Sequence, residues 1–344
     1  MAEKRGFTKF PSELRQEPVS QKWIVIATGR GKRPEMFKKN KEKKVEDNLK
    51  DCPFCNIATQ ETPVLIFNKG KKMPISKNPK NWTTVVIPNK FPAFLVSDKL
   101  EEKTDGPYTR INGAGYHEVV ITRDHKKSLG QLSVSQIKEV LEAYQERYLE
   151  LADEKFVNYA HIFHNHGHSA GASLTHPHSQ IITTPVSTPE LFLVLKRLKD
   201  YFEETKRCLY CDILKWEREK KERIIFENEE FVVLCPYASR SAFEVRIYPK
   251  KHEPYFEKIA GKTKDYLAEA LKTALYKIYK GLNNPDYNFF LHTAPCDEKE
   301  YKYYHWHFVI YPRTSIAAGF EIGSQIHVST IEPEKAAEFL RKIK

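Results

Sequence analysis

The sequence predicts an α+β fold made of two similar half-domains, each an antiparallel sheet with a long helix packed on it. A Cys-x-x-Cys-polar-Ile pattern begins at Cys52 and occurs again at Cys208. After each copy the same elements follow in the same order: strands, an amphipathic helix, another strand, and a closing strand that begins His-x-His. Because one order of elements is written twice, we expect a tandem duplication, with residues 1–190 as the first half-domain and residues 191–344 as the second.

The strands are predicted from short runs that are rich in β-branched and aromatic residues. The runs of the first half are 83–88, 116–122, 159–163 and 176–182. Their counterparts in the second half are 230–234, 242–249, 289–291 and 305–311. Residues 1–51 precede the first copy and add one strand, 23–27, and a basic turn, 30–34.

The helix of each half is predicted from apolar residues that recur every three or four positions. The first helix is expected over 135–152, with Ser133 or Ser135 as its N-cap, and the second over 263–279. A charged stretch, 191–207, is expected to form a further helix at the joint between the halves. The apolar face comprises Ile137, Val140, Leu141, Tyr144, Tyr148 and Leu151 in the first helix, and Tyr266, Leu267, Ala270, Leu271 and Leu275 in the second.

The composition fits a soluble protein with a substantial core. Of the 344 residues, 40% are hydrophobic and 12% are aromatic. No apolar run reaches the roughly 18 residues that a membrane span needs, and the polar N-terminus lacks the apolar core of a secretion signal. We therefore expect a cytoplasmic protein without a membrane partner. The net charge of +11 suits either nucleic acid or a small phosphorylated substrate.

Each half offers two cysteines and two histidines for a metal ion. A Cys-x-x-Cys turn supplies two thiolates from one loop, and a tetrahedral zinc ion then needs two further ligands. Histidines stand at matching places in the two halves, one at a strand end and one at the start of the His-x-His strand. In a chain without a secretion signal, such cysteine pairs favour metal binding over a disulfide framework. The prediction is two structural zinc ions, one held by Cys52, Cys55, His125 and His176 and the other by Cys208, Cys211, His252 and His305.

His178 differs from the other histidines in its surroundings. The small-residue turn 169–174 precedes it, and the backbone N–H groups of such a turn can approach an anion closely. Gln180 stands two positions further on, so its side chain lies on the same face of the strand. A histidine that attacks phosphorus needs a neutral ring held in one tautomer and donors for the phosphoryl oxygens. His178 is therefore a candidate covalent nucleophile, with Gln180 and Ser173 as candidate donors.

The motif His176-Pro177-His178-Ser179-Gln180, the first Cys-x-x-Cys and the turn Gly171-Ala172-Ser173 together resemble the galactose-1-phosphate uridylyltransferase family. That family is a branch of the histidine-triad superfamily with two tandem half-domains. The resemblance implies a ping-pong reaction of galactose metabolism, in which the histidine takes the uridylyl group from UDP-glucose and passes it to galactose 1-phosphate. The resemblance runs from about residue 13 to the C-terminus and includes the segments 23–26, 30–34, 88–92, 163–165 and 319–323.

The resemblance also assigns roles to individual positions. Gln180 corresponds to the residue that hydrogen-bonds the transferred phosphoryl group. Arg30 and Arg33 correspond to basic residues near the phosphates, where guanidinium groups suit oxyanions. Family members are often homodimers, so a homodimer is implied here. The nucleotide- and phosphate-contacting positions of the family correspond to Asn89, Phe91, Asn165, Gly171 and Ser173.

Three departures from the family pattern bear on the substrate. Ser179 stands where better-known bacterial members have glycine, and no glutamate matches the iron site that some of them carry. The second cysteine pair resembles instead a two-zinc branch that includes plant ADP-glucose phosphorylase-like proteins, which also have serine at this position. A lysine expected in the C-terminal loop has no clear match, although Arg313 lies nearby in the sequence.

The leading interpretation is a UDP-glucose:hexose-1-phosphate uridylyltransferase. The alternative with the same chemistry is an ADP-glucose phosphorylase or adenylyltransferase. A more distant alternative is a zinc-containing nucleic-acid-binding protein, but the aromatic residues lie in predicted strands rather than among basic clusters. We expect a nucleotide sugar and a hexose 1-phosphate as partners, and no nucleic acid. The sequence assigns no role to His117, His292 or His307.

Overall fold

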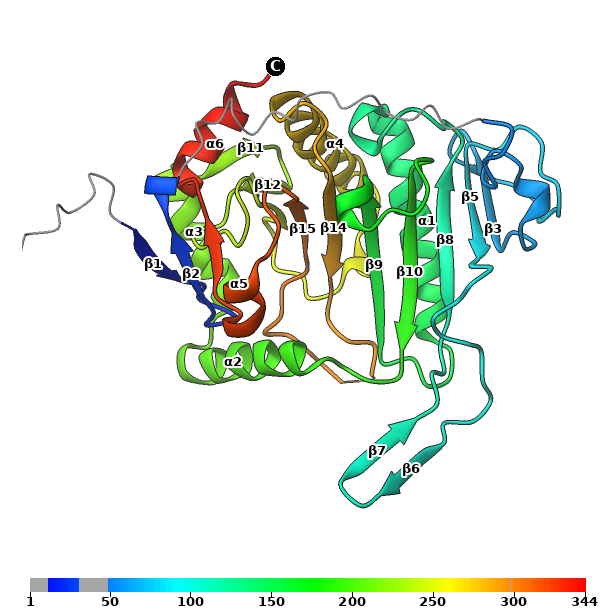
Figure 1. Ribbon diagram of the computed structural model, residues 1–344, viewed down its shortest axis with the longest axis horizontal. Helices are drawn as coiled ribbons and strands as arrows, with labels where there is room; N and C mark the ends of the chain where they lie inside the picture. The colour runs from blue at the N-terminus through cyan, green and yellow to red at the C-terminus, as the bar shows by residue number, and fades with distance from the viewer. Residues whose placement is uncertain (1–11, 31–48, 298) are drawn as a thin grey trace, which may run out of the picture.

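The computed structural model describes residues 12–30, 49–297 and 299–344. Its main feature is one antiparallel sheet of eleven strands (Figure 1). The two halves join where β9 pairs with β14, with Phe163 opposite Phe290, so the two predicted sheets form one continuous sheet. From one edge to the other the strands are β11 (Ile224–Glu227), β12 (Phe231–Leu234), β13 (Val245–Pro249), β15 (His307–Pro312), β14 (Tyr287–His292), β9 (Tyr159–His166), β10 (His178–Thr184), β8 (His117–Thr122), β5 (Thr84–Pro88), β3 (Leu65–Asn68) and β4 (Lys71–Lys72).

The two predicted core helices are confirmed as α1 (Val134–Ala152) and α4 (Thr263–Gly281). They contact each other and cover the same face of the sheet, one behind each half (Figure 1). Ser133 caps α1 by accepting a hydrogen bond from the backbone of Gln136, which satisfies an N–H group that the helix leaves unpaired. A single apolar core lies between the helices and the sheet and includes residues of both halves.

The opposite face of the sheet carries the first cysteine loop. Along β10, Ser179 and Ile181 point toward α1, so His178 and Gln180 point away from it. A separate apolar cluster on that side joins Phe54 of the loop to strands β5 and β8. The first cysteine loop and the candidate nucleophile therefore lie on the same face.

The N-terminal strands pack with the second half of the chain. β1 (Glu13–Gln16) and β2 (Trp23–Ile26) form a three-stranded sheet with β16 (His327–Ser329), and β2 and β16 run parallel. The predicted strand 23–27 is thus confirmed as β2. The division into half-domains at residue 190 stays a prediction, and this small sheet unites residues from both sides of it.

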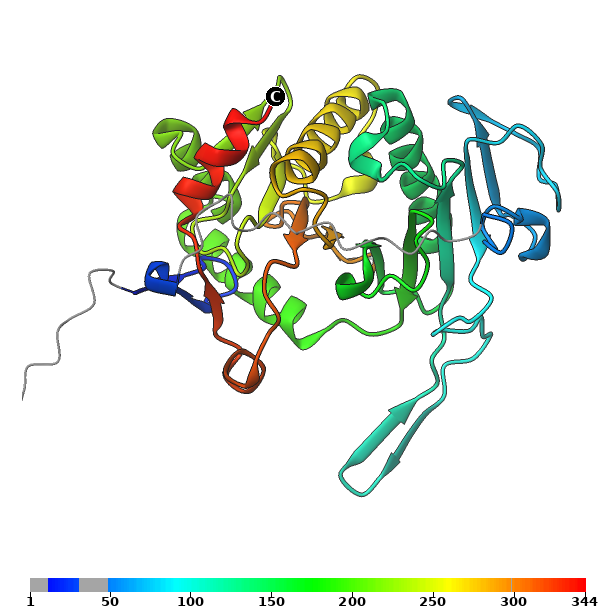
Figure 2. The ribbon, with the colours of Figure 1, turned by 45° about the horizontal axis from the view of Figure 1, so that its top comes forward.

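The remaining elements connect or extend this body. α2 (Pro189–Thr205) is the predicted helix at the joint, and α3 (Leu209–Lys220) follows it at once. α5 (Gly319–Ser324) and α6 (Pro333–Lys342) lie on either side of β16 in the sequence. The hairpin of β6 (Glu102–Asp105) and β7 (Tyr108–Ile111) projects away from the sheet (Figure 2). Within the described residues, no helix is both long and apolar enough to cross a membrane.

Candidate functional site

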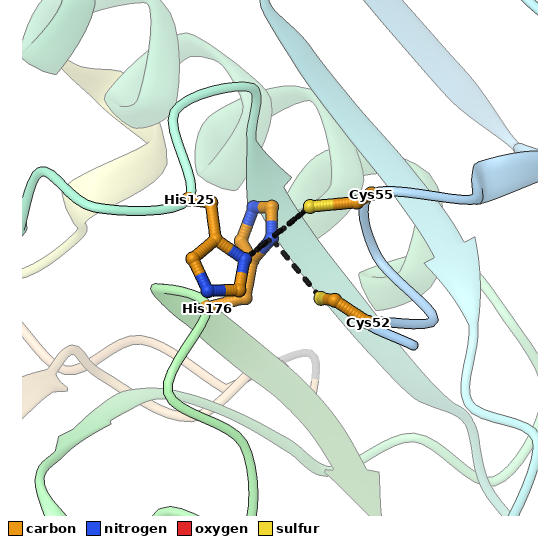
Figure 3. Close-up of side chains that lie close together, drawn as sticks. All are labelled: Cys52, Cys55, His125 and His176. Carbon is orange, nitrogen blue, oxygen red and sulfur yellow. Dashed lines mark hydrogen bonds between the residues drawn. The ribbon is translucent and has the colours of Figure 1, made fainter. Parts of the chain in front are cut away.

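The first predicted metal ligands lie together. The ligand atoms of Cys52, Cys55, His125 and His176 are all within 4.8 Å of one another. The four side chains point toward one another (Figure 3). The Sγ of Cys55 is 3.3 Å from Nδ1 of His125 and 3.5 Å from Nδ1 of His176. Such separations are those of ligands at about 2.0–2.3 Å from a common tetrahedral ion. This donor set fits zinc.

The ring orientation of His176 also suits a metal. Its Nε2 lies 2.8 Å from the carbonyl oxygen of Thr122. Because a carbonyl oxygen only accepts, Nε2 carries the proton and Nδ1 presents its lone pair to the cysteines. Metal-binding histidines are commonly fixed in this way by a hydrogen bond from the other ring nitrogen.

The second predicted set has the same construction. The ligand atoms of Cys208, Cys211, His252 and His305 lie within 4.8 Å of one another. Nε2 of His305 donates to the carbonyl oxygen of Pro249 at 2.9 Å, and Nε2 of His252 donates to that of Lys302 at 2.8 Å. Both histidines therefore direct Nδ1 toward the cysteine pair. The structure brings together all eight predicted ligands, in the two groups that were expected.

His178 opens strand β10 and is only 7% exposed. Its Nδ1 lies 2.8 Å from the carbonyl oxygen of His176, so this nitrogen carries the proton and Nε2 keeps its lone pair. Burial lowers the pKa of His178, which favours the neutral ring at neutral pH. The ring of Phe54, from the first cysteine loop, packs edge-on against it with centroids 5.1 Å apart. The metal loop thus supports the candidate nucleophile directly.

Gln180 lies beside His178 on the same strand face and contacts His117. Its Oε1 is 2.8 Å from Nε2 of His117. The same ring nitrogen lies 3.0 Å from Nδ2 of Asn89, which follows β5. Asn89 also accepts a hydrogen bond from the backbone N–H of Phe91 at 2.9 Å. Asn89 and Gln180 therefore meet at His117, a residue to which the sequence gave no role.

Asn165 is held from the second half of the chain. Its Oδ1 accepts from Nδ2 of Asn288 at 2.8 Å, and Oδ1 of Asn288 accepts from Nε of Arg313 at 2.7 Å. The amide nitrogen of Asn165 is therefore turned away from Asn288. Asn288 was not predicted from the sequence, because only the pairing of β14 with β9 places it opposite Asn165.

The turn before the nucleophile is fixed by Asp286, which precedes β14. Asp286 accepts from the backbone N–H of Ser169 at 2.8 Å and from its hydroxyl at 2.5 Å. Gly167 and Gly171 both have φ of +85°, a conformation that favours glycine. A Cβ at Gly171 would lie 3.9 Å from the amide nitrogen of Asn165, so the turn passes close to that side chain. Ser173, near the end of this turn, is exposed.

The other predicted substrate residues are Phe91, Arg30 and Arg33. Phe91 is 83% exposed. Arg30 ends a short 3-10 helix, Thr28–Arg30, that continues from β2 in the three-stranded sheet. Ile24 of β2 lines the same cavity as Ile182 and Thr184 of β10. Arg33 lies outside the described residues.

A hydroxyl cluster lies behind the nucleophile, on the helix side of the sheet. The Ser179 hydroxyl is 2.5 Å from the Tyr144 hydroxyl of α1 and 3.1 Å from Nδ1 of His164. All three residues are buried. Ser179 is the position at which the sequence departs from the better-known family members.

A cavity of about 660 Å³ adjoins the site on the side of the second half. It is bounded by strands β9, β14 and β15, by α2 and by residues 17–24. Of the predicted site residues in the described part of the chain, Asn165 alone lines it. Asn165 therefore belongs both to the predicted nucleophile site and to the wall of the cavity.

Two family models cover nearly the whole chain. The model described as galactose-1-phosphate uridyl transferase, N-terminal domain, matches residues 8–188, and its C-terminal counterpart matches residues 194–344. This chain belongs to the galactose-1-phosphate uridyl transferase family. It is therefore a nucleotidyltransferase of that family, and the sequence-based resemblance is confirmed.

The relatives of this uridyl transferase family member include enzymes with different nucleotides in their names. ADP-glucose phosphorylase of Arabidopsis thaliana is 36% identical over 338 residues, which cover 96% of this chain and 93% of the relative. Galactose-1-phosphate uridylyltransferase of Thermotoga maritima is 28% identical over 340 residues, or 96% and 98% of the two chains. Similarity to both kinds of enzyme leaves the nucleotide open.

Solved structures confirm the fold. The crystal structure of the Arabidopsis ADP-glucose phosphorylase with bound ADP-glucose matches with a TM-score of 0.78 at 32% identity, over 97% of this chain and 100% of the other. A uridylyltransferase structure matches with a TM-score of 0.72 at 27% identity, over 96% and 97% of the two chains. The α+β architecture is therefore that of known transferases of this family.

Proposed function

We propose that this nucleotidyltransferase forms a covalent nucleotidyl intermediate on His178. The observation that carries the proposal is the hydrogen bond from Nδ1 of His178 to the His176 carbonyl oxygen. It fixes the tautomer in which Nε2 has a free lone pair, as a nucleophile requires. Gln180 shares a face of β10 with His178, and Asn165 follows His164, which pairs with Ser179. Both amides can donate to phosphoryl oxygens.

The reaction proceeds in two displacements at one phosphorus. Nε2 of His178 attacks the α-phosphorus of a nucleoside diphosphate hexose, and hexose 1-phosphate leaves with the electron pair of the broken P–O bond. An oxygen of the acceptor then attacks the same phosphorus, and the bond to His178 breaks. One nucleophile can serve both steps because the leaving group and the acceptor are both phosphates.

We infer that the two Cys-Cys-His-His clusters bind zinc in a structural role. Four protein ligands leave no open coordination position for a substrate. The first ion would hold His176, whose carbonyl oxygen orients His178. The six cysteines, all of which lie in the described residues, form no disulfide, which supports a reducing compartment such as the cytoplasm.

We propose ADP-glucose as the donor to test first, with phosphate as the acceptor. The Arabidopsis ADP-glucose phosphorylase is more similar to this chain in sequence and structure than the uridylyltransferases described above. UDP-glucose with galactose 1-phosphate is the second candidate, supported by the family model and the Thermotoga relative. The exposed Arg313, which contacts Asn288 beside Asn165, is a candidate contact for the phosphate of the acceptor.

We further propose a homodimer. The segment around α5 exposes Ile316, Phe320 and Ile322, and such an apolar patch is typical of an interface. Light scattering, which gives the mass in solution, distinguishes a dimer from a single chain.

The test is to incubate the protein separately with ADP-glucose and UDP-glucose that carry radioactive phosphorus at the α position. We expect one of the two to leave an acid-labile label on the protein, and His178→Ala to abolish this label while the bound zinc is unchanged. Hexose 1-phosphate should appear in amounts equal to the label. A His178→Ala protein that is still labelled, or that still turns over, would contradict the nucleophile assignment.

A further inference from the structure

We propose that His117 is a positioning residue that holds the side-chain amide of Gln180 with its nitrogen turned toward the transferred phosphoryl group. The inference rests on the proposed function, in which Gln180 donates to that group. An amide has a donor end and an acceptor end of nearly equal size, so a glutamine in a phosphate site must be fixed in one orientation to act as a donor.

The orientation of the Gln180 amide follows from a backbone N–H group, which can donate a hydrogen bond but cannot accept one. The N–H of Ala93 lies 3.1 Å from Nδ1 of His117 and can only donate. Nδ1 must therefore be the unprotonated nitrogen of the neutral ring, and Nε2 carries the proton. Nε2 lies 2.8 Å from Gln180 and meets its oxygen, Oε1. The amide nitrogen of Gln180 is then left for another acceptor.

The protonation state of His117 agrees with this arrangement. A doubly protonated ring would place an N–H group of Nδ1 against the N–H of Ala93. Burial lowers the pKa of His117, although the hydrogen bond to Gln180 acts in the opposite direction. The neutral ring is therefore the form present at neutral pH.

Asn89 also contacts His117. Its Oδ1 is occupied by the N–H of Phe91, so its amide nitrogen faces Nε2 of His117 at 3.0 Å. With the proton on Nε2, this is a contact between two donors.

The chain offers a matched control for His117. Ile182 of β10 pairs with His117 on one side and with His161 of β9 on the other. Residues directly opposite in an antiparallel pair share a face, so the two histidines lie at the same level of the same face. Burial lowers the pKa of His161 as well, but its ring contacts Tyr159 at 4.5 Å between centroids.

The test is a double-mutant cycle on the rate of labelling of His178. His117→Phe keeps a ring and removes both nitrogens. We expect it to slow labelling by about tenfold to a hundredfold at saturating nucleotide sugar, because losing a donor to a phosphoryl transition state has effects of this size or larger. The KM for the nucleotide sugar should change by less than about threefold. His161→Phe should leave the rate within about twofold of wild type.

Two further variants separate positioning from a general structural role. If His117 acts through Gln180, His117→Phe should have almost no additional effect in a Gln180→Ala background. His117→Gln places an amide nitrogen near the position of Nε2 and should recover most of the rate. Zinc content and melting temperature are measured for every variant.

The inference is overturned if His117→Phe labels at the wild-type rate, if its effect is undiminished in the Gln180→Ala background, or if His117→Gln is as slow as His117→Phe. A wild-type protein that takes no label from either nucleotide sugar would contradict the proposed function itself, and this inference with it. A labelled wild type with an unchanged His117→Phe rate would contradict the inference alone.

Discussion

The hydroxyl of Ser179 connects the nucleophile strand to the helix behind it. It lies between the Tyr144 hydroxyl and Nδ1 of His164, and Tyr144 and His164 are fully buried. A glycine here, as in better-known members of the family, would leave both partners without this hydrogen bond. A buried hydroxyl without a partner costs about 1–3 kcal/mol. Ser179 and Tyr144 therefore have to be understood as a pair.

We predict that Ser179→Ala lowers the free energy of unfolding by about 1–3 kcal/mol. Adding Tyr144→Phe should restore part of this loss, because the second change removes the hydroxyl that the first leaves unpaired. His164 loses the Ser179 hydroxyl in Ser179→Ala and also in the double variant. Comparing these two proteins therefore isolates the contribution of Tyr144. Urea unfolding of the two single variants and the double variant measures the coupling. Strictly additive losses would show that the two hydroxyls do not interact.

At the scale of elements, the two halves share a framework but differ in chemistry. Nδ1 of His307 lies 3.1 Å from the carbonyl oxygen of His305, as Nδ1 of His178 lies 2.8 Å from that of His176. Two positions beyond His307, however, stands Val309, where the first half has Gln180. A valine cannot donate to a phosphoryl oxygen. The duplication therefore keeps the Cys-Cys-His-His cluster in both halves and the glutamine amide, the proposed phosphoryl donor, in one.

We predict that His252→Ala removes one of two zinc ions and lowers the melting temperature by at least about 5 °C, while labelling of His178 continues. The matched variant in the first half is His125→Ala. It should also lose one zinc ion, but it should slow labelling, because the ring of Phe54 and the carbonyl oxygen of His176 both depend on that cluster. Metal analysis, melting curves and labelling rates check both variants. Equal labelling by the two proteins would show that the first cluster does not support the nucleophile.

Repetition explains which elements could be predicted from the sequence. The helix expected from residue 135 begins at Val134, and the eight predicted metal ligands group as the repeat indicated. The continuous sheet was not predictable in the same way, because the pairing of β9 with β14 depends on register between distant strands. The small sheet of β1, β2 and β16 likewise joins segments about 300 residues apart in the sequence.

The site residues differ in the same way. Some could be predicted from their neighbours in the sequence, and others depend on contacts with distant residues. His178 and Gln180 were predictable because their spacing on one strand places them on one face. The role of His117 was not, because it depends on a backbone N–H group 24 residues earlier in the chain. Phe54 stands inside the first Cys-x-x-Cys, so its contact with His178 could have been anticipated from the loop that carries it.

At the scale of the whole molecule, the carboxylate of Glu334 connects the N-terminal strand β1 with the C-terminal helix α6. Glu334 of α6 contacts Nη1 of Arg15 from β1 at 2.8 Å and Nη1 of Arg223 at 2.6 Å. Both arginines are almost completely buried, and Arg223 also pairs with Glu217. The N-terminal strands are thereby fixed to the C-terminal helix. This contact holds the small sheet, and with it the strand that leads to Arg30, in one position.

The pKa of Glu334 gives this contact a dependence on pH. Burial acts to raise the pKa, but the hydrogen bonds from Arg15 and Arg223 outweigh it, and the pKa falls below its ordinary value of 4.5. A carboxylate with a lower pKa in the folded state stabilises the protein above its unfolded pKa, and this stability is lost as the pH falls through the folded pKa.

We therefore predict that Glu334→Gln lowers the free energy of unfolding by about 2 kcal/mol at pH 7. Because the substituted side chain does not titrate, the difference from wild type should stay constant down to about pH 5.5 and shrink steadily below pH 4.5. Urea unfolding of both proteins across this range measures the difference. A difference that grows on acidification would mean that the carboxylate is not stabilised by the two arginines.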